Sequence, residues 1–250
     1  MTENINSLNL IEIDKMISIQ QLQKKYGDQL VLDIPELTIT EGESIGLVGN
    51  NGAGKTTLIS LLLDLIQPTS GKVLVNGTAV DEDRSWKQYT GAYLDDNFLI
   101  DFLTPDEYFE FAAHTHGWND ADLQQFLEPY LPFLNDEVVG QKKYIRNLSK
   151  GNRKKTGIIA SLIGHPDVLI LDEPFANLDP STQIRLKQLI KSLSDEKLVF
   201  VSSHDLSHVT EVCDRILILD KGKLVKDVPK TEETLKELEN YFGSVSQEEE

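Results

Sequence analysis

The sequence predicts an α/β fold in which a mostly parallel sheet is covered by helices. Three features support this prediction. Short apolar runs that look like strands alternate with helical patterns along the chain. A glycine-rich loop at residues 49–54 lies between one such strand and one such helix. Between about Leu94 and Gly164 strand patterns are absent and helical ones dominate, which indicates a helical insertion in a core that is discontinuous in sequence.

The strands of this core are short and apolar, as is typical of buried strands in α/β proteins. The clearest strand patterns lie at Ser44–Val48, Val168–Asp172, Leu198–Ser202 and Arg215–Leu219. The last of these continues through Lys221-Gly222 into residues 223–226. This arrangement predicts a hairpin or tight turn at a sheet edge.

Helical patterns follow several of the strands. Residues Lys55–Ile66 are apolar on most faces, so we expect this helix to be buried between the sheet and its neighbours. A second helix is predicted to begin at Thr104, where Thr-Pro-Asp-Glu supplies an N-cap, a proline in the first turn and a capping glutamate, Glu107. Further helices are predicted at Asp120–Leu127, Ser149–Ile163, Pro180–Leu193 and Thr231–Tyr241.

The composition is that of a globular protein with one sizeable domain, since 40% of the 250 residues are hydrophobic and 26% are charged. The longest apolar stretch, Leu58–Ile66, is interrupted by Ser60 and Asp64. It is far shorter than the roughly 18 apolar residues that suggest a bilayer span. The acidic N-terminus also lacks the pattern of a secretory signal. With a single cysteine, Cys213, these features favour a reducing, cytoplasmic location.

The net charge of −17 disfavours binding to nucleic acid or to anionic lipid, because both would repel the average surface. Part of this charge lies in residues 229–250, where we expect an acidic helix and tail. A solvated tail is the simplest interpretation, and a tail that docks a partner is the alternative.

The glycine-rich loop matches the pattern G-x-x-x-x-G-K-[ST]. Its glycines let the loop curl so that backbone N–H groups point at phosphate oxygens, and the following helix adds the positive end of its dipole. Lys55 is expected to reach the β- and γ-phosphates of ATP, and the Thr56 hydroxyl to complete a Mg²⁺ site. A glycine-rich turn without a ligand is the alternative. The residues assigned to nucleotide binding here are Gly49, Asn50, Asn51, Gly52, Ala53, Gly54, Lys55, Thr56 and Thr57.

A pair of acids ends the predicted strand Val168–Asp172. An apolar strand that ends in a carboxylate brings an acid to the metal beside the phosphates, so Asp172 is predicted to bind Mg²⁺. Glu173 follows at once and is predicted to orient or deprotonate the water that attacks the γ-phosphate. Such a pair is common after strands, and it gains weight here from its combination with the glycine loop.

Four further segments resemble motifs of the ATP-binding subunits of ABC transporters, in that family's order. Leu148–Asn152 is similar to the signature motif L-S-G-G-Q, and Ala176–Asp179 is similar to the D-loop. His204 resembles the switch histidine, and Tyr26 resembles the aromatic residue that stacks on adenine. The resemblance extends from about residue 17 to residue 228.

This resemblance implies a P-loop NTPase with a RecA-like core, an antiparallel β subdomain and an inserted helical subdomain. The core would comprise residues 17–93 and 165–228, and the insertion residues 94–164. It also implies a head-to-tail dimer in which each ATP lies between the glycine loop of one subunit and Ser149, Lys150 and Gly151 of the other. His204 would act with Lys55 and Glu173 in catalysis.

Two positions depart from the family pattern. The signature has Lys150 and Asn152 where the family usually has glycine and glutamine, although Ser149 and Gly151 are kept. Tyr93-Leu94-Asp95-Asp96 aligns with the Q-loop pattern Y-L-P-Q, so Asp96 replaces the glutamine. An aspartate can bind a metal, and we count Asp96 as a candidate Mg²⁺ ligand. A solvated loop acid is the alternative.

The function that these motifs predict is ATP hydrolysis that powers transport by a separate membrane-spanning permease. The chain would then lie on the inner face of the membrane, with a docking surface at Asp95–Asp101 and the helix from Thr104. The variant signature and the acidic Q-loop resemble bacterial exporters. The alternatives are a soluble ATPase that acts on a macromolecular complex, and a regulatory ATP-binding module with weakened catalysis.

Overall fold

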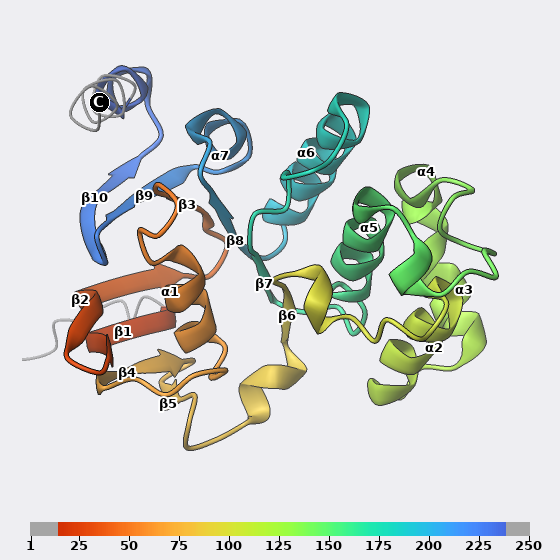
Figure 1. Cartoon of the computed structure of the whole chain (residues 1–250), viewed down its shortest axis with the longest axis horizontal. Coiled ribbons are helices and arrows are strands. Elements are labelled where there is room, and N and C mark those ends of the chain that lie inside the picture. The colour runs from red at the N-terminus through yellow and green to blue at the C-terminus, as the bar shows by residue number, and fades with distance from the viewer. Residues whose placement is uncertain (1–14, 239–250) are drawn as a thin grey trace, which may run out of the picture.

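A computed structural model describes residues 15–238, and its strands form two sheets of different kind (Figure 1). The antiparallel sheet has the order β2-β1-β4-β5. Its strands are β1 (Lys15–Tyr26), β2 (Gln29–Thr40), β4 (Ser70–Val75) and β5 (Thr78–Ala79). The second sheet has the order β10-β9-β3-β8-β7-β6, and all its pairs are parallel except β9 with β10. Its strands are β3 (Ser44–Val48), β6 (Thr90–Tyr93), β7 (Val168–Leu171), β8 (Leu198–Ser203), β9 (Arg215–Asp220) and β10 (Lys223–Pro229).

Helices cover both faces of the parallel sheet, and its central strands β3, β7 and β8 are buried along their whole length. Successive side chains point to opposite faces of a strand. Leu169 and Leu171 accordingly join an apolar cluster with the helical part, whereas Val168 and Ile170 join a second cluster with α1 and the antiparallel sheet. The α-helices are α1 (Lys55–Leu62), α2 (Pro105–Thr115), α3 (Asp120–Leu127), α4 (Leu131–Leu134), α5 (Lys150–Ala160), α6 (Pro180–Ser194) and α7 (Leu206–Val212).

The helical part is the segment from Leu94 to Gly164, and it contains α2 to α5 and no strand. In Figure 1 it lies beside β6 and β7 and away from the antiparallel sheet. Short 3₁₀ helices connect it and its neighbours: η1 (Ser85–Gln88), η2 (Asp96–Phe98), η3 (Glu128–Tyr130) and η4 (Ile145–Asn147). The α/β fold with a parallel sheet, an antiparallel part and a helical insertion is therefore confirmed. The exact domain boundaries at residues 94 and 164 stay a prediction.

Helix α2 begins as the sequence predicts. The Glu107 N–H donates to the Thr104 hydroxyl oxygen, and the Glu107 carboxylate accepts from the Thr104 N–H at 2.8 Å. Proline occupies the first turn, where its missing N–H costs nothing. The predicted strands and the β9–β10 hairpin are also present, with end points that differ by a few residues at most.

Two predicted helices are shorter than expected. The helix predicted at Lys55–Ile66 ends at Leu62, because Asp64 adopts a left-handed φ of 50° and the Leu65 N–H donates to the Ser60 carbonyl at 2.8 Å. In α5, Ser149 is the N-cap and the helix ends at Ala160, before Gly164 at φ 89°. Helix α7 was not predicted, although Asp205 caps it in the expected way.

The C-terminal prediction lies only partly within the described residues. Residues 232–238 are helical, whereas 239–250 lie outside the part of the chain that the structure describes. Glu237 pairs with Lys226 of β10. Among the described residues, no helix is long and apolar enough to cross a bilayer.

Candidate nucleotide-binding and catalytic site

The carboxyl ends of the parallel strands bring the predicted site residues to one edge of the sheet. The glycine loop follows β3, Asp172 and Glu173 follow β7, and His204 follows β8, which lies between the other two strands. Loops at this edge of an open parallel sheet are the usual place for a ligand. The fold therefore gathers residues that are more than a hundred positions apart in the chain.

The glycine loop needs its glycines for two different reasons. Gly52 and Gly54 have φ values of 84° and 109°, which side chains strongly disfavour. At Gly49 an added Cβ would lie 2.3 Å from the Leu219 carbonyl oxygen. Gly54 precedes α1 and offers no side chain to cap it, and no acid occupies its first turn. The N-terminal N–H groups of α1 are thus suited to an anion.

Lys55 is buried at the start of α1. Its Nζ donates to the Gly49 carbonyl at 2.7 Å and lies 3.3 Å from Oε1 of Glu173. The lysine therefore joins the glycine loop to the acid that follows β7. An ammonium group in this position can pair with the negative charge of phosphates bound to the loop.

Thr56 and Asp172 contact each other, so their oxygen atoms are close enough to bind one metal ion. The Thr56 hydroxyl donates to Oδ2 of Asp172 at 2.8 Å. The Ser202 hydroxyl donates to the other oxygen, Oδ1. Burial raises the pKa of the Asp172 carboxyl above its ordinary value, although the hydrogen bonds from Ser202 and Thr56 act to lower it. Hydroxyl and carboxylate oxygens are the ligands that Mg²⁺ prefers, so these residues fit the ion.

The side chain, the N–H and the carbonyl of Glu173 each have a protein partner. Its carboxylate lies 2.9 Å from Nδ1 of His204, and its N–H donates to the Ser202 hydroxyl oxygen at 3.0 Å. Its carbonyl accepts from the Lys154 ammonium group at 2.6 Å. The backbone has a φ of 46°, in the left-handed region. This conformation is uncommon for residues with side chains and points to a functional constraint.

Tyr26 shares one hollow with the glycine loop. The hollow has a volume of about 290 Å³ and is also lined by Gly52, Lys55, Thr57 and Glu173. Tyr26 ends β1 and is 54% exposed, and Nζ of Lys24 lies 5.0 Å from the centroid of its ring. Tyr26 therefore lies beside the glycine loop, and its stacking on adenine stays a prediction.

The signature residues lie apart from this hollow. Ser149 caps α5 by accepting from the Asn152 N–H, and it lines a separate hollow of about 540 Å³. Lys150 lines a third hollow, together with Asp96, Asp172 and Glu173. An added Cβ at Gly151 would make only ordinary contacts, with Leu178 and the Asn177 carbonyl oxygen. Within one chain, Ser149 is therefore not part of the hollow that the glycine loop forms.

Asp96 has protein partners for both carboxylate oxygens. Oδ1 accepts from the Tyr93 hydroxyl at 2.7 Å. Oδ2 forms an ion pair with Arg153, with Nε at 3.3 Å. The Nε–H of Arg153 does not point at this oxygen closely enough to form a hydrogen bond. Burial and the Asp96 carboxylate raise the pKa of Tyr93. Asp96 thus ties η2 to β6 and α5, and among the described residues no group of three or more His, Cys, Asp or Glu side chains could hold a metal.

Two residues of the site were missed by sequence reasoning. Ser202 contacts both Asp172 and the Glu173 N–H, and Lys154 contacts the Glu173 carbonyl. Ser202 lies near the end of the apolar strand β8, shortly before His204, and this position could have marked it. Lys154 is one of three basic residues in a row, and nothing in the sequence sets it apart from Arg153 and Lys155.

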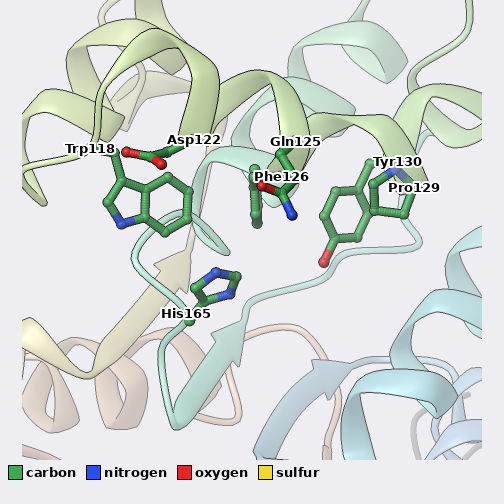
Figure 2. Close-up of a pocket in the computed structure, with 7 residues that line it drawn as sticks. All are labelled: Trp118, Asp122, Gln125, Phe126, Pro129, Tyr130 and His165. Carbon is green, nitrogen blue, oxygen red and sulfur yellow. The ribbon is translucent and has the colours of Figure 1, made fainter.

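A separate hollow of about 400 Å³ on the helical part has an aromatic lining (Figure 2). Trp118, Phe126 and Tyr130 come from the helical part, and His165 faces them from the segment before β7. The ring of Trp118 lies 5.3 Å from that of Phe126 and 4.9 Å from that of His165. None of the predicted site residues lines this hollow, so the rings are best explained by packing.

Comparison with known proteins gives one consistent family. Residues 32–176 match the family model described as ABC transporter. The chain is 37% identical over 214 residues to an ABC transporter ATP-binding protein of Methanocaldococcus jannaschii, covering 84% of this chain and 76% of that protein. It is 40% identical over 191 residues to one from Nostoc, covering 76% of this chain but 57% of that relative's length. It is 29% identical over 214 residues to the Nod factor export ATP-binding protein I of Burkholderia lata, covering 84% of this chain and 70% of that protein.

Solved structures agree with these relatives. An ATP-binding subunit of an ABC transporter matches with a TM-score of 0.77 and 26% identity, over 91% of this chain and 93% of that one. CbiO1 from Clostridium perfringens, described as part of the ABC transporter complex CbiONQ, matches with a TM-score of 0.72 and 25% identity, over 86% and 89% of the two chains.

Proposed function

Because this chain belongs to the ABC transporter family of ATP-binding proteins, we propose that it hydrolyses ATP and thereby powers transport through a separate membrane-spanning permease. One observation carries the proposal. The Thr56 hydroxyl and the Asp172 carboxylate are hydrogen-bonded at 2.8 Å, beside a Lys55 ammonium that lies 3.3 Å from Glu173. Phosphate binding, metal binding and a general base would thus be supplied at one edge of the sheet.

Substrate binding would use the loop and the helix together. The N–H groups of residues 49–57 would bind the phosphates, and Lys55 would turn from the Gly49 carbonyl and Glu173 to the β- and γ-phosphates. Thr56 and Asp172 would hold Mg²⁺, which supplies positive charge to the phosphate oxygens when bound. We assign only these two residues to the metal, because Asp96 contacts Tyr93 and Arg153.

Hydrolysis would depend on Glu173. Its carboxylate would accept a proton from the water that attacks the γ-phosphorus, while the bond from that phosphorus to the bridging oxygen of ADP breaks. His204 would keep the carboxylate in place through the contact at 2.9 Å and reach the γ-phosphate with its other ring nitrogen. Lys55 would stabilise the charge on the phosphate oxygens.

A second copy of the chain would complete each site. Ser149, Lys150 and Gly151 lie at the N-terminus of α5, where N–H groups favour a phosphate. Since Ser149 lines a hollow separate from the glycine loop of its own chain, the γ-phosphate that it binds would belong to the partner's nucleotide. Two ATP molecules would then be enclosed in a head-to-tail dimer.

The permease would dock on the exposed apolar side chains of the helical part. Phe98 and Phe102 are 60% and 61% exposed, and Phe111 of α2 is 50% exposed. All three follow the Q-loop in sequence, and Phe98 lines a hollow together with Leu94, Tyr108 and His116. Exposed large apolar residues that gather in this way mark interaction sites. The partner would hold the chain at the inner face of the membrane, and the Nod factor export relative favours export as the direction.

Two measurements test this proposal. Calorimetric titration with Mg-ATP should give heat of binding, and the chain should release phosphate in a Mg²⁺-dependent reaction, which would also exclude a purely regulatory module. Folded protein that gives no heat would overturn the proposal.

For the permease, the membrane protein encoded by the neighbouring open reading frame should co-purify from detergent extract with the wild-type chain. Phe98→Asp and Phe102→Asp should reduce that recovery, whereas Ile184→Asp, at a 58% exposed site on α6, should not. Equal recovery of all variants would refute this docking surface.

A further inference from the structure

Lys154 is a buried lysine at the proposed active site, and it is not among the residues assigned above to phosphate binding. It lies on α5, is 7% exposed, and donates from Nζ to the main-chain carbonyl of Glu173 at 2.6 Å. It lines the neighbouring hollow with Asp172 and Glu173, and not the hollow of the glycine loop. A lysine is rarely this buried unless a partner holds its charge, and here the partner is the backbone of the proposed base.

The backbone of Glu173 needs such support. Its φ of 46° is uncommon for a residue with a side chain and persists only where surrounding contacts fix it. On one side the N–H donates to the Ser202 hydroxyl oxygen, and on the other the carbonyl accepts from Lys154. These two contacts fix the direction in which the side chain leaves the backbone.

Burial lowers the pKa of the Lys154 ammonium group overall, and the acids around it act in the opposite direction. These acids are Asp96, Glu173, Asp95 and Asp172. The Tyr93 ring, whose centroid lies 5.7 Å from Nζ, adds a favourable contact for a cation. Asp96, the residue in the Q-loop glutamine position, therefore contributes to an environment that suits a lysine on α5.

We propose that Lys154 is a positioning residue for hydrolysis, whose ammonium group holds the Glu173 carbonyl so that the carboxylate faces Lys55 and His204. This inference rests on the proposed ATPase function. It predicts an effect on turnover and not on nucleotide affinity, because Lys154 acts through the backbone of the base. Ser149 caps the same helix, so α5 would connect the partner's nucleotide to the base of its own site.

The test compares three variants of the full chain. Lys154→Met removes the donor at similar length and should lower kcat about ten- to a hundredfold, as expected for a lost hydrogen bond from a charged group. The Kd for ATP, measured by calorimetry, should stay within about twofold of wild type. Lys154→Arg keeps a charged donor and should restore most of kcat. Lys155→Met is the matched control, since Lys155 is equally buried on α5 but lies near Glu137 and Asp179, and its kcat should stay near wild type.

The outcomes separate this inference from the function on which it rests. If wild type hydrolyses ATP and Lys154→Met does so at the same rate, the positioning role is refuted and the proposed function stands. Equal loss in Lys154→Met and Lys155→Met, or weaker ATP binding without loss of kcat, also refutes it. If wild type hydrolyses no ATP, both ideas fail. Should Lys154→Met not fold, Lys154→Gln replaces it, and kcat equal to that of Lys154→Arg would count against a need for the charge.

Discussion

The parallel sheet and the helical part differ in how closely they follow the family pattern. At the sheet edge the glycine loop, Asp172, Glu173 and His204 match that pattern, and the four form a connected set of contacts through Lys55 and Thr56. The helical part carries the departures, Asp96, Lys150 and Asn152. The residues proposed for chemistry therefore lie at the sheet edge, whereas the departures from the family pattern lie among the residues of the helical part that surround them.

The two regions are nevertheless packed together. Phe109 and Phe126 of the helical part belong to the same apolar cluster as Leu171 and Val201 of the sheet. Lys154 adds a polar contact from α5 to the end of β7. The helical part is therefore an insertion in sequence that shares its apolar core with the sheet. It differs from the sheet in the charged side chains that it brings to the site.

The largest effect should follow from Glu173→Gln, which tests the sheet side of the comparison. Loss of a general base costs about 10²–10⁴-fold in rate, so ATP turnover should nearly stop. The amide leaves Lys55 without its ion pair, so ATP should still bind and should stabilise a dimer, seen by gel filtration with and without ATP. Glu211→Gln, which removes a surface ion pair with Lys187, is the control and should hydrolyse ATP normally. Unimpaired hydrolysis by Glu173→Gln would contradict its role.

Phe109→Ala tests whether the regions unfold together. Phe109 is fully buried, and truncating such a ring costs about 3–5 kcal/mol. Trp118 lies in the helical part and Trp86 packs in the other cluster with the antiparallel sheet, so fluorescence of Trp86→Phe and Trp118→Phe backgrounds reports each region separately. Because the apolar cluster spans the boundary, we expect both probes to shift to lower denaturant by the same amount. A shift of the Trp118 signal alone would show that the helical part unfolds independently.

A matched pair of aspartates sharpens the comparison at the metal. Asp172 and Asp96 line the same hollow of about 350 Å³, one from the sheet and one from the helical part. Asp172→Asn should raise the Mg²⁺ concentration for half-maximal hydrolysis at least about tenfold, because it removes a ligand charge. Asp96→Asn should change it less than about threefold, because Asp96 is engaged by Tyr93 and Arg153. A large rise for Asp96→Asn would restore it as a third ligand.

Local backbone requirements explain what could be predicted from the sequence. The glycine loop was predictable because its positive φ values and its close approach to Leu219 admit few residues other than glycine. The start of α2 was predictable because Thr104 and Glu107 satisfy each other's N–H groups within one turn. In both cases the sequence pattern lies within a few consecutive residues, although Leu219 itself is far from the glycine loop in the chain.

The residues that escaped prediction act over longer separations. Lys154 is 19 positions from Glu173, and Ser202 is 29 positions from it. Their roles depend on how α5 and β8 lie against β7, which composition and spacing do not report. For the same reason the sequence left two interpretations of Asp96, a metal ligand or a solvated acid, because its partner Arg153 belongs to a different helix.

The smallest effect concerns the first turn of α2, where the helical part begins. Thr104→Ala removes the N-cap and should lower the free energy of unfolding by about 1 kcal/mol. The bonds from Thr104 lower the pKa of Glu107, so their contribution is present above its ordinary value of 4.5 and is lost as the pH falls through the lowered value. The deficit of Thr104→Ala in urea titrations should accordingly narrow in acid. Thr115→Ala, at an exposed threonine near the end of the same helix, should cost less than about 0.5 kcal/mol, and equal costs would show that capping is not the cause.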